Sequence, residues 1–220
     1  MSTLEPRLAD LPDALPVFPL AEVLLLPRGH LPLNIFEPRY LAMVEDALAT
    51  KRMIGMIQPA DPTSQDSSPR LYGTGCAGRI SRFEETGDGR YLIALKGVCR
   101  FDAVEELPMA RGYRRIRPDW TRHAGDLVAE SDAGLDRDRL LDVLRRYFER
   151  HGLSADWDTL RQAPDERLVT CLSMICPFGA SEKQALLEAP NLRARGAMLT
   201  TLVEMAVLGD TSSGPGGARQ

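Results

Sequence analysis

The segment Phe36-Glu37-Pro38-Arg39-Tyr40 combines aromatic, acidic and basic side chains where an apolar, strand-like stretch ends and a helical pattern begins. Aromatic side chains can cover apolar groups of a ligand, and a few charged groups can fix its orientation. The candidate peptide-binding residues are therefore Phe36, Glu37, Arg39 and Tyr40. The favoured interpretation of the segment is architectural, because Pro38 suits the first helical turn and Arg39 could pair with a carboxylate or carbonyl to fix the junction.

Histidine and cysteine could carry nucleophilic or metal chemistry, but their spacing favours neither. His30, His123 and His151 stand in no Ser/Cys–His–acid or paired-histidine motif. No two of the four cysteines are separated by the two intervening residues of a Cys-x-x-Cys zinc motif. Reduced core thiols are therefore expected. The sequence thus predicts no catalytic residue, no metal, no cofactor and no enzymatic activity, although residues far apart in sequence could still converge.

A basic segment, Arg111-Gly-Tyr-Arg-Arg-Ile-Arg117, contains ingredients of nucleic-acid binding, because its arginines alternate with Tyr113. The neighbouring Glu105, Glu106 and Asp119 oppose much of this charge, so an ordinary solvated strand is the favoured interpretation. A separate observation concerns triphosphate binding. The phosphate loop Gly-x-x-x-x-Gly-Lys-Ser/Thr that an ATPase motor needs is absent from the sequence, because no lysine follows a glycine. Nucleic-acid binding is kept only as a minor alternative.

The elements that must position these side chains are mainly strands in the N-terminal part of the chain. Apolar or alternating patterns predict strands near residues 15–20, 23–26, 30–36, 53–58, 72–86, 91–96, 98–105 and 113–118. Pro38 to Arg52 predicts one helix between strands, and Thr86-Gly-Asp-Gly89 predicts a hairpin turn. Many short strands with glycine turns and one helix indicate a small, closed or semi-closed β-barrel.

Beyond Trp120 the pattern becomes hydrophilic and then helical. Apolar residues at helical spacing predict four helices that end near Gly152, Pro177, Glu188 and Gly209. An α+β protein is therefore expected. Its predicted parts are a flexible leader at 1–14, a β-rich lobe at 15–120, a linker at 121–134, a helical bundle lobe at 135–209 and a flexible tail at 210–220.

Composition indicates a soluble chain with its own core. The 220 residues are 44% hydrophobic, which is enough to bury a core without disulfides or metals. The formal net charge of -4, from 27 basic and 31 acidic residues, predicts no general attraction to phosphate backbones or anionic membranes. No signal peptide and no apolar run of about 20 residues is found. A cytoplasmic protein without membrane association is expected, with its oligomeric state left open.

Several motifs resemble, in order, the N-terminal substrate-recognising domain of Lon proteases. The most specific is Leu31-Pro-Leu-Asn-Ile-Phe-Glu-Pro-Arg-Tyr40. It is accompanied by Leu15-Pro-Val-Phe-Pro-Leu20, Gly75-Cys-Ala-Gly78, Asp88-Gly-Arg-Tyr-Leu-Ile93, Gly97-Val-Cys-Arg-Phe101, Cys176-Pro-Phe178 and Glu182-Lys-Gln-Ala-Leu-Leu-Glu188. The resemblance covers residues 15–208 and implies a PUA-like β-barrel lobe followed by a helical lobe. The residue pattern predicts the same division independently.

The resemblance also implies recognition without processing, because neither the ATPase motor nor the serine–lysine protease of full-length Lon is expected in these 220 residues. The leading hypothesis is a non-catalytic peptide- or protein-binding module. Its expected partners are unfolded or partly folded polypeptides, held in a cleft between the two lobes. The alternatives are a regulatory adaptor that docks onto a protease or another partner, and an RNA-binding PUA-like protein.

Overall fold

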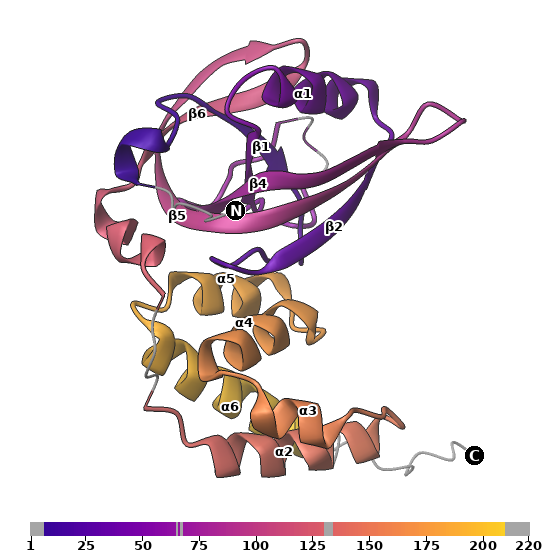
Figure 1. Cartoon of the computed structure of the whole chain (residues 1–220), viewed down its shortest axis with the longest axis vertical. Coiled ribbons are helices and arrows are strands. Elements are labelled where there is room, and N and C mark those ends of the chain that lie inside the picture. The colour runs from indigo at the N-terminus through magenta and orange to yellow at the C-terminus, as the bar shows by residue number, and fades with distance from the viewer. Residues whose placement is uncertain (1–6, 65, 67, 130–133, 210–220) are drawn as a thin grey trace, which may run out of the picture. The chain divides into compact units, whose positions relative to one another are not determined.

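The computed structural model describes residues 7–64, 66, 68–129 and 134–209, and Figure 1 labels most of their helices and strands. They belong to two compact units. The barrel unit comprises Met1–Ala129 together with Ser173–Glu188, and the helical unit comprises Glu130–Leu172 together with Ala189–Gln220. The prediction of an α+β protein with strands first and helices after them is confirmed.

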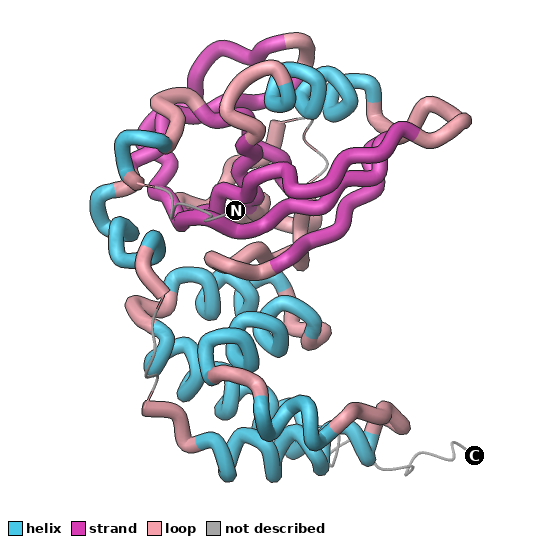
Figure 2. Tube along the Cα trace, viewed as in Figure 1, coloured by secondary structure: helices cyan, strands magenta, loops and turns pink. Residues whose placement is uncertain are grey.

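Six strands form one mixed sheet in the barrel unit (Figure 2). They are β1 (Leu15–Pro19), β2 (His30–Ile35), β3 (Met53–Ile57), β4 (Thr74–Glu85), β5 (Tyr91–Ala110) and β6 (Tyr113–Asp119). The strand order is β2-β5-β4-β3-β1-β6, and β5 also pairs with β6. Five strands therefore close into a ring, and β2 pairs only with β5 at its outer side. The β1–β3 pair is parallel and the others are antiparallel.

The ring closes because β5 is long enough to serve two neighbours. Its first part pairs with β2 and β4, and its second part pairs with β6. The sequence pattern predicts two strands here, separated by Gly97, whereas the structure has one strand with a bulge at Val98. A bulge bends a strand and increases its twist, as the closure of a small barrel requires.

Gly97 is needed at this bulge because another part of the chain passes directly over it. A Cβ atom at position 97 would lie 2.0 Å from the carbonyl oxygen of Leu26. The amide of Gly97 donates to the carbonyl of Gly29, and the amide of Arg28 donates to the carbonyl of Gly97, both at 2.8 Å. The strand predicted at 23–26 is therefore wrong, because this segment is an irregular chain whose leucines are buried against the barrel.

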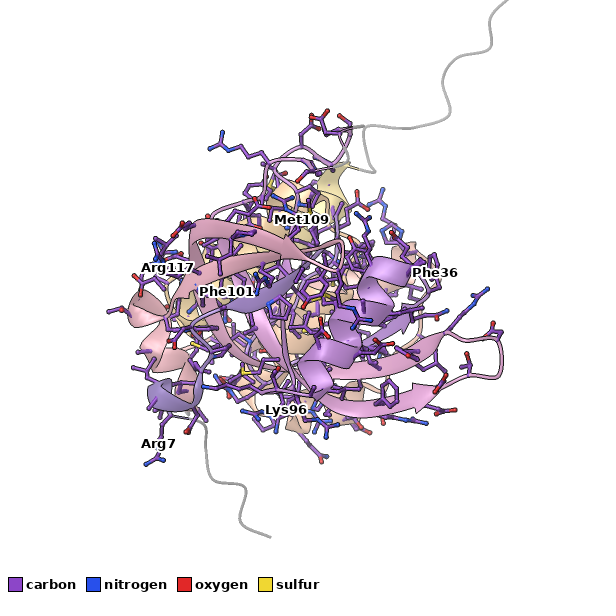
Figure 3. The ribbon with its side chains drawn as sticks, turned by 90° about the horizontal axis from the view of Figure 1, so that it is seen from above. Arg7, Phe36, Lys96, Phe101, Met109 and Arg117 are labelled. Atoms are coloured by element: carbon purple, nitrogen blue, oxygen red, sulfur yellow. The ribbon has the colours of Figure 1, made fainter. Side chains whose placement is uncertain are left out.

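The barrel interior is apolar, with Phe101 at its centre in the view of Figure 3. The Phe101 ring is fully buried, and Trp120 packs against it edge-on at a centroid distance of 5.8 Å. Helix α1 (Pro38–Leu48) connects β2 to β3 and buries its inner face. It begins where the sequence predicts, with Glu37 as its N-cap residue and Pro38 in the first turn.

Two polar segments are more ordered than their composition suggests. The pattern predicts a linker at 121–134, whereas Thr121–Leu127 form a 3-10 helix, η2, in which His123 is buried. The pattern also predicts a flexible leader at 1–14, whereas Leu8–Asp10 form a 3-10 turn, η1, and Leu11 is buried. Residues 1–6 of that leader and 130–133 of that linker lie outside the described residues. A short 3-10 segment buries only one or two side chains, so it leaves no apolar period to detect.

The remaining helices are α2 (Arg137–Arg150), α3 (Trp157–Gln162), α4 (Asp165–Ile175), α5 (Ala180–Glu188) and α6 (Leu192–Gly209). Four of them correspond to the predicted helices, and the short α3, which Asp156 caps, is additional. Helix α5 belongs to the barrel unit, because the side-chain amide of Gln184 donates to the carbonyl of Thr74 in β4 at 3.1 Å. The predicted tail at 210–220 lies outside the described residues.

Candidate functional site

A pocket of about 360 Å³ opens beside the start of α1 in the barrel unit. This volume lies within the range of about 300–1,000 Å³ that ligand pockets span. Three segments contribute apolar surface, through Pro19 of β1, Pro59 and Pro69 of the β3–β4 connection, and Met109 of β5. Met109 lies on β5 close to its turn into β6 and is labelled in Figure 3. The pocket thus combines an apolar wall with polar groups from α1 and β6.

Tyr40 is one of the residues that line this pocket. Its residue is only 7% exposed, and its ring packs against Phe18 at a centroid distance of 4.3 Å. Burial raises the pKa of Tyr40, and the neighbouring Arg39 only partly opposes this effect, so the phenol stays protonated. No hydrogen bond joins the Tyr40 side chain to the part of the chain that the structure describes. Its O–H group can therefore donate to a ligand.

Arg39 is held in place at the rim of the pocket. Its guanidinium donates to the Glu37 carboxylate, with nitrogen–oxygen distances of 2.9 Å, and it lies 4.6 Å from the centroid of the Tyr40 ring. Both charged side chains remain almost half exposed. An ion pair of this kind contributes little to stability, but it restricts the directions in which Arg39 can point.

The β5–β6 hairpin is tied to α1 by hydrogen bonds. The Tyr113 hydroxyl donates to Asp46 at 2.8 Å, and Arg111 donates to Asp46 and Glu45 at 2.9 and 2.7 Å. Burial and the hydrogen bond to Asp46 raise the pKa of Tyr113 to about 12. The part of the pocket formed by α1 and the part formed by the β5–β6 hairpin are therefore joined by hydrogen bonds.

The buried Arg114 connects the β5–β6 hairpin to the β3–β4 connection. The Arg114 guanidinium donates twice to the Glu106 carboxylate, at 2.6 Å each, and once to the carbonyl of Pro69, at 2.7 Å. Its side chain is only 10% exposed. Arg114 therefore links Pro69 to the β5–β6 hairpin.

Of the four residues predicted from the sequence, Arg39 and Tyr40 line the pocket. Glu37 acts on it only through Arg39, and Phe36 does not line it. The Phe36 side chain is 60% exposed, and the Arg90 guanidinium lies 5.8 Å from its ring centroid. Sequence reasoning missed Met109 and the prolines, since only the closure of the barrel brings them beside α1.

Three of the four arginines in the basic segment at the β5–β6 hairpin are paired with carboxylates, and Arg115 donates to the carbonyl of Pro108. Arg111 pairs with Glu45 and Asp46, Arg114 pairs with Glu106, and Arg117 pairs with Glu105. Phosphate contacts would require these cations to leave carboxylates that already hold them. The ion pairs thus argue against the nucleic-acid alternative.

Among the described residues, the buried imidazole of His123 is not paired with a nucleophile. The Nε2 atom of His123 lies 3.4 Å from Oδ1 of Asp102, and the Thr74 hydroxyl donates to that same oxygen rather than to the imidazole. Burial raises the pKa of the Cys99 thiol to about 12 and that of Cys176 to about 11, so neither is a thiolate near neutral pH.

The described residues offer neither a metal site nor a membrane-spanning helix. Within residues 7–64, 66, 68–129 and 134–209, no group of three or more His, Cys, Asp or Glu side chains could hold a metal ion. Over the same part of the chain, every helix is too short or too polar to cross a membrane.

Residues 14–205 match the family model of the ATP-dependent protease La (LON) substrate-binding domain. Lon protease 2 of Myxococcus xanthus is 25% identical over 198 residues, which cover 88% of this chain and 24% of that protein. Lon protease of Dictyoglomus thermophilum is 30% identical over 198 residues, which cover 84% of this chain and 24% of that protein. The chain therefore spans about a quarter of the length of these curated relatives.

Two solved structures share the fold. The crystal structure of a Lon N-terminal domain protein from Xanthomonas campestris superposes with a TM-score of 0.60 at 22% identity, covering 86% of this chain and 97% of that one. The N-terminal domain of Mycobacterium avium complex Lon protease gives a TM-score of 0.62 at 14% identity, with coverages of 87% and 98%. These 220 residues contain no ATPase or protease region. Because the family model matches most of its length, this chain belongs to the LON substrate-binding domain family.

Proposed function

We propose that this protein is a non-catalytic polypeptide-binding module that holds apolar segments of unfolded or partly folded chains in the pocket beside Arg39 and Tyr40. Membership of a substrate-binding family supports a polypeptide as the ligand. The observation that carries the proposal is that one pocket combines an apolar wall with Tyr40, whose hydroxyl forms no hydrogen bond with the described residues.

Binding would combine apolar burial with one or two directional contacts. An apolar side chain of the ligand would cover Met109 and the prolines, while the Tyr40 hydroxyl donates to a backbone carbonyl. Full burial of one large apolar side chain contributes about 1.5–3 kcal/mol. The entropy lost on ordering an extended chain offsets much of this gain, so a single segment should bind with a dissociation constant on the order of micromolar.

The test uses a pair of matched methionine variants. Met109 is 64% exposed at the pocket, and Met205 is 60% exposed on α6. Met109→Gln and Met205→Gln each replace a thioether by an amide of similar size without changing the charge. Binding of a short, uncharged, labelled peptide rich in Leu and Phe is measured by fluorescence anisotropy.

Met109→Gln should weaken this binding by about three- to tenfold, because the apolar wall loses its most exposed side chain. Met205→Gln should leave it unchanged. A second variant, Tyr40→Phe, keeps the ring that packs against Phe18 and should cost about three- to tenfold through the lost hydrogen bond. The proposal fails if wild-type protein does not bind the peptide, or if both methionine variants bind it like wild type.

Three expectations from the sequence stay predictions. They are a cleft between the two lobes, a role as a regulatory adaptor and a cytoplasmic location. An adaptor that docks through a fixed surface elsewhere would keep its partner in the Met109→Gln variant, whereas a partner captured as an apolar segment would be released.

A further inference from the structure

A second and larger cavity, of about 940 Å³, lies in the barrel unit and is lined by an unusual number of cations. They are Arg7, Arg28, Lys51, Arg52, Arg79 and Lys96. In Figure 3, the labelled Arg7 and Lys96 lie on one side of the barrel and Met109 lies on the opposite side, with Phe101 between them. This basic cavity is therefore separate from the pocket beside Arg39 and Tyr40.

The carboxylates of the basic cavity are already engaged. Asp10 lies 3.6 Å from the Arg7 guanidinium, and Asp126 accepts hydrogen bonds from Arg100, which does not line the cavity. Lys51 donates to the carbonyl of Leu11 rather than to an acid. Four of the six cations form no ion pair with any carboxylate among the described residues: Lys51, Arg52, Arg79 and Lys96.

Several arginines elsewhere on the barrel surface are paired. Arg39, Arg82, Arg90, Arg111 and Arg117 are each paired with a carboxylate. The whole chain carries a formal net charge of -4. Arg70, Arg115 and Lys183 of the barrel unit also form no ion pair among the described residues and lie outside the cavity, but Lys51, Arg52, Arg79 and Lys96 gather in one depression, where their fields add and attract anions.

The arrangement is also unfavourable for the fold itself. Arg79 of β4 and Lys96 of β5 are Cα partners directly opposite one another in the sheet. Like charges at directly opposite positions destabilise a strand pair. Lys51 and Arg52, in the turn after α1, add further positive charge to the same cavity. An anionic ligand would relieve the repulsion that the fold leaves uncompensated.

The shape and composition of the basic cavity favour a polypeptide as that ligand. The described residues that line it include no aromatic side chain, so the cavity lacks the stacking platform that single-stranded nucleic acids use. Its cations come from five separate segments around small apolar side chains such as Ala9, Val98 and Leu127. An extended chain with spaced Asp and Glu residues could reach several of these cations and still cover the apolar surface between them.

We propose that the basic cavity binds acidic segments of polypeptides, as a second recognition site that rests on the proposed peptide-binding function. The pocket beside Arg39 and Tyr40 selects apolar segments, and the basic cavity selects segments by their negative charge. Because the two sites lie on opposite sides of the barrel, a short peptide would occupy one of them and a longer unfolded chain could engage both.

The test compares two double variants that remove the same formal charge. Arg52→Gln/Lys96→Gln neutralises two cations of the basic cavity whose side chains have no ion pair in the described structure. Arg82→Gln/Arg117→Gln neutralises two exposed arginines outside it, which are paired with Glu84 and Glu105. The probe is a short labelled peptide with alternating Glu and Ala, and its control has Gln in place of each Glu.

We expect wild-type protein to bind the Glu peptide more tightly than the Gln peptide, and more weakly as salt rises from about 50 to about 200 mM. The cavity double variant should lose about tenfold in affinity, which corresponds to about 1.4 kcal/mol. The control double variant should lose less than about twofold. Equal losses in the two variants would show a general charge effect and overturn the proposal, as would tighter binding of a single-stranded RNA of equal charge.

Failure of this proposal can be told from failure of the proposed function. The uncharged Leu/Phe peptide should bind the cavity double variant like wild type, and the Glu peptide should bind Met109→Gln like wild type. If only the Leu/Phe peptide fails to bind wild-type protein, the apolar pocket is wrong and the basic cavity stands. If only the Glu peptide fails to bind it, the basic cavity is wrong.

Discussion

The Arg100 guanidinium of β5 donates two parallel hydrogen bonds to the Asp126 carboxylate of η2. The distances are 2.9 Å from Nε to Oδ2 and 2.8 Å from Nη2 to Oδ1. The two side chains are only 6% and 10% exposed. The backbone amide of Arg100 donates to the same carboxylate at 2.9 Å, and Nη1 donates to the carbonyl of Leu187 in α5 at 3.0 Å. One guanidinium therefore joins three segments of the barrel unit that are far apart in sequence.

Asp126→Asn should destabilise the protein strongly, because it leaves a buried guanidinium without its counter-charge. Breaking a buried pair on one side costs about 3–5 kcal/mol. Urea unfolding gives the free energy of unfolding. The control is Glu84→Gln, which breaks the exposed pair with Arg82 and should cost no more than about 1 kcal/mol. Similar losses in both variants would show that burial of the Arg100–Asp126 pair has no energetic consequence.

The Asp126 carboxyl should also make stability depend on pH in the acid range. Burial alone would raise its pKa, but the hydrogen bonds and charge of Arg100 outweigh burial and hold the pKa below the ordinary value of 3.8. The stabilisation is complete above pH 3.8, and it is lost as the pH falls through the lower pKa of the folded state. Unfolding measured as a function of pH should show this loss in wild type and a smaller one in Asp126→Asn.

His123 should contribute at higher pH than Asp126. Burial, followed by the charge of Arg100, lowers its pKa below 6.5 against the opposing effect of Asp102. The unfolded chain then takes up a proton at a pH where folded His123 is still neutral. Stability should therefore fall as the pH drops from 6.5 to the folded pKa and change no further through this group below it. His123→Gln should flatten the curve just below pH 6.5, and an unchanged slope there would contradict the assignment.

Gly97→Ala should be among the most destabilising glycine substitutions in the barrel. The new methyl group would lie 2.0 Å from the Leu26 carbonyl oxygen. This oxygen is a backbone atom that accepts a hydrogen bond from the amide of Gly29, so it cannot move away easily. Overpacking of this kind costs at least about 1–3 kcal/mol. Gly87→Ala, in the open hairpin turn with nothing within 4 Å, is the matched control. Thermal unfolding should show a lower Tm for Gly97→Ala and little change for Gly87→Ala.

A fragment that ends at residue 134 should have a loosened barrel, although it contains every strand. It lacks α5, so Arg100 loses the Leu187 carbonyl and Thr74 loses the Gln184 amide. Each buried polar group left without its partner costs about 1–3 kcal/mol. Hydrogen exchange should be faster at β4 and β5 in fragment 1–134 than in fragment 1–188, which keeps α5. Equal protection in both fragments would show that α5 is dispensable.

The sequence alone determined the features that depend on local pattern. Pro38 and the preceding Glu37 predicted the start of α1, and Thr86 to Gly89 predicted the hairpin turn, in which Gly89 has a φ of +79°. The alternation of apolar residues predicted most strands. The ordered motifs, above all the ten residues that end at Tyr40, pointed to the family that the match over residues 14–205 confirms.

Only the tertiary structure decided which distant residues meet. Closure of the ring between β5 and β6 brings Met109 and Tyr40 into the same pocket. The two residues are too far apart in sequence for a hydrophobic period to predict that they meet. The Arg100–Asp126 pair orders a segment whose polar composition predicts a linker, because one buried ion pair leaves no repeating pattern. The pairing of Arg79 with Lys96 likewise depends on strand register. Local pattern reports which face of an element is apolar, whereas long-range contacts decide what that face and its polar neighbours touch.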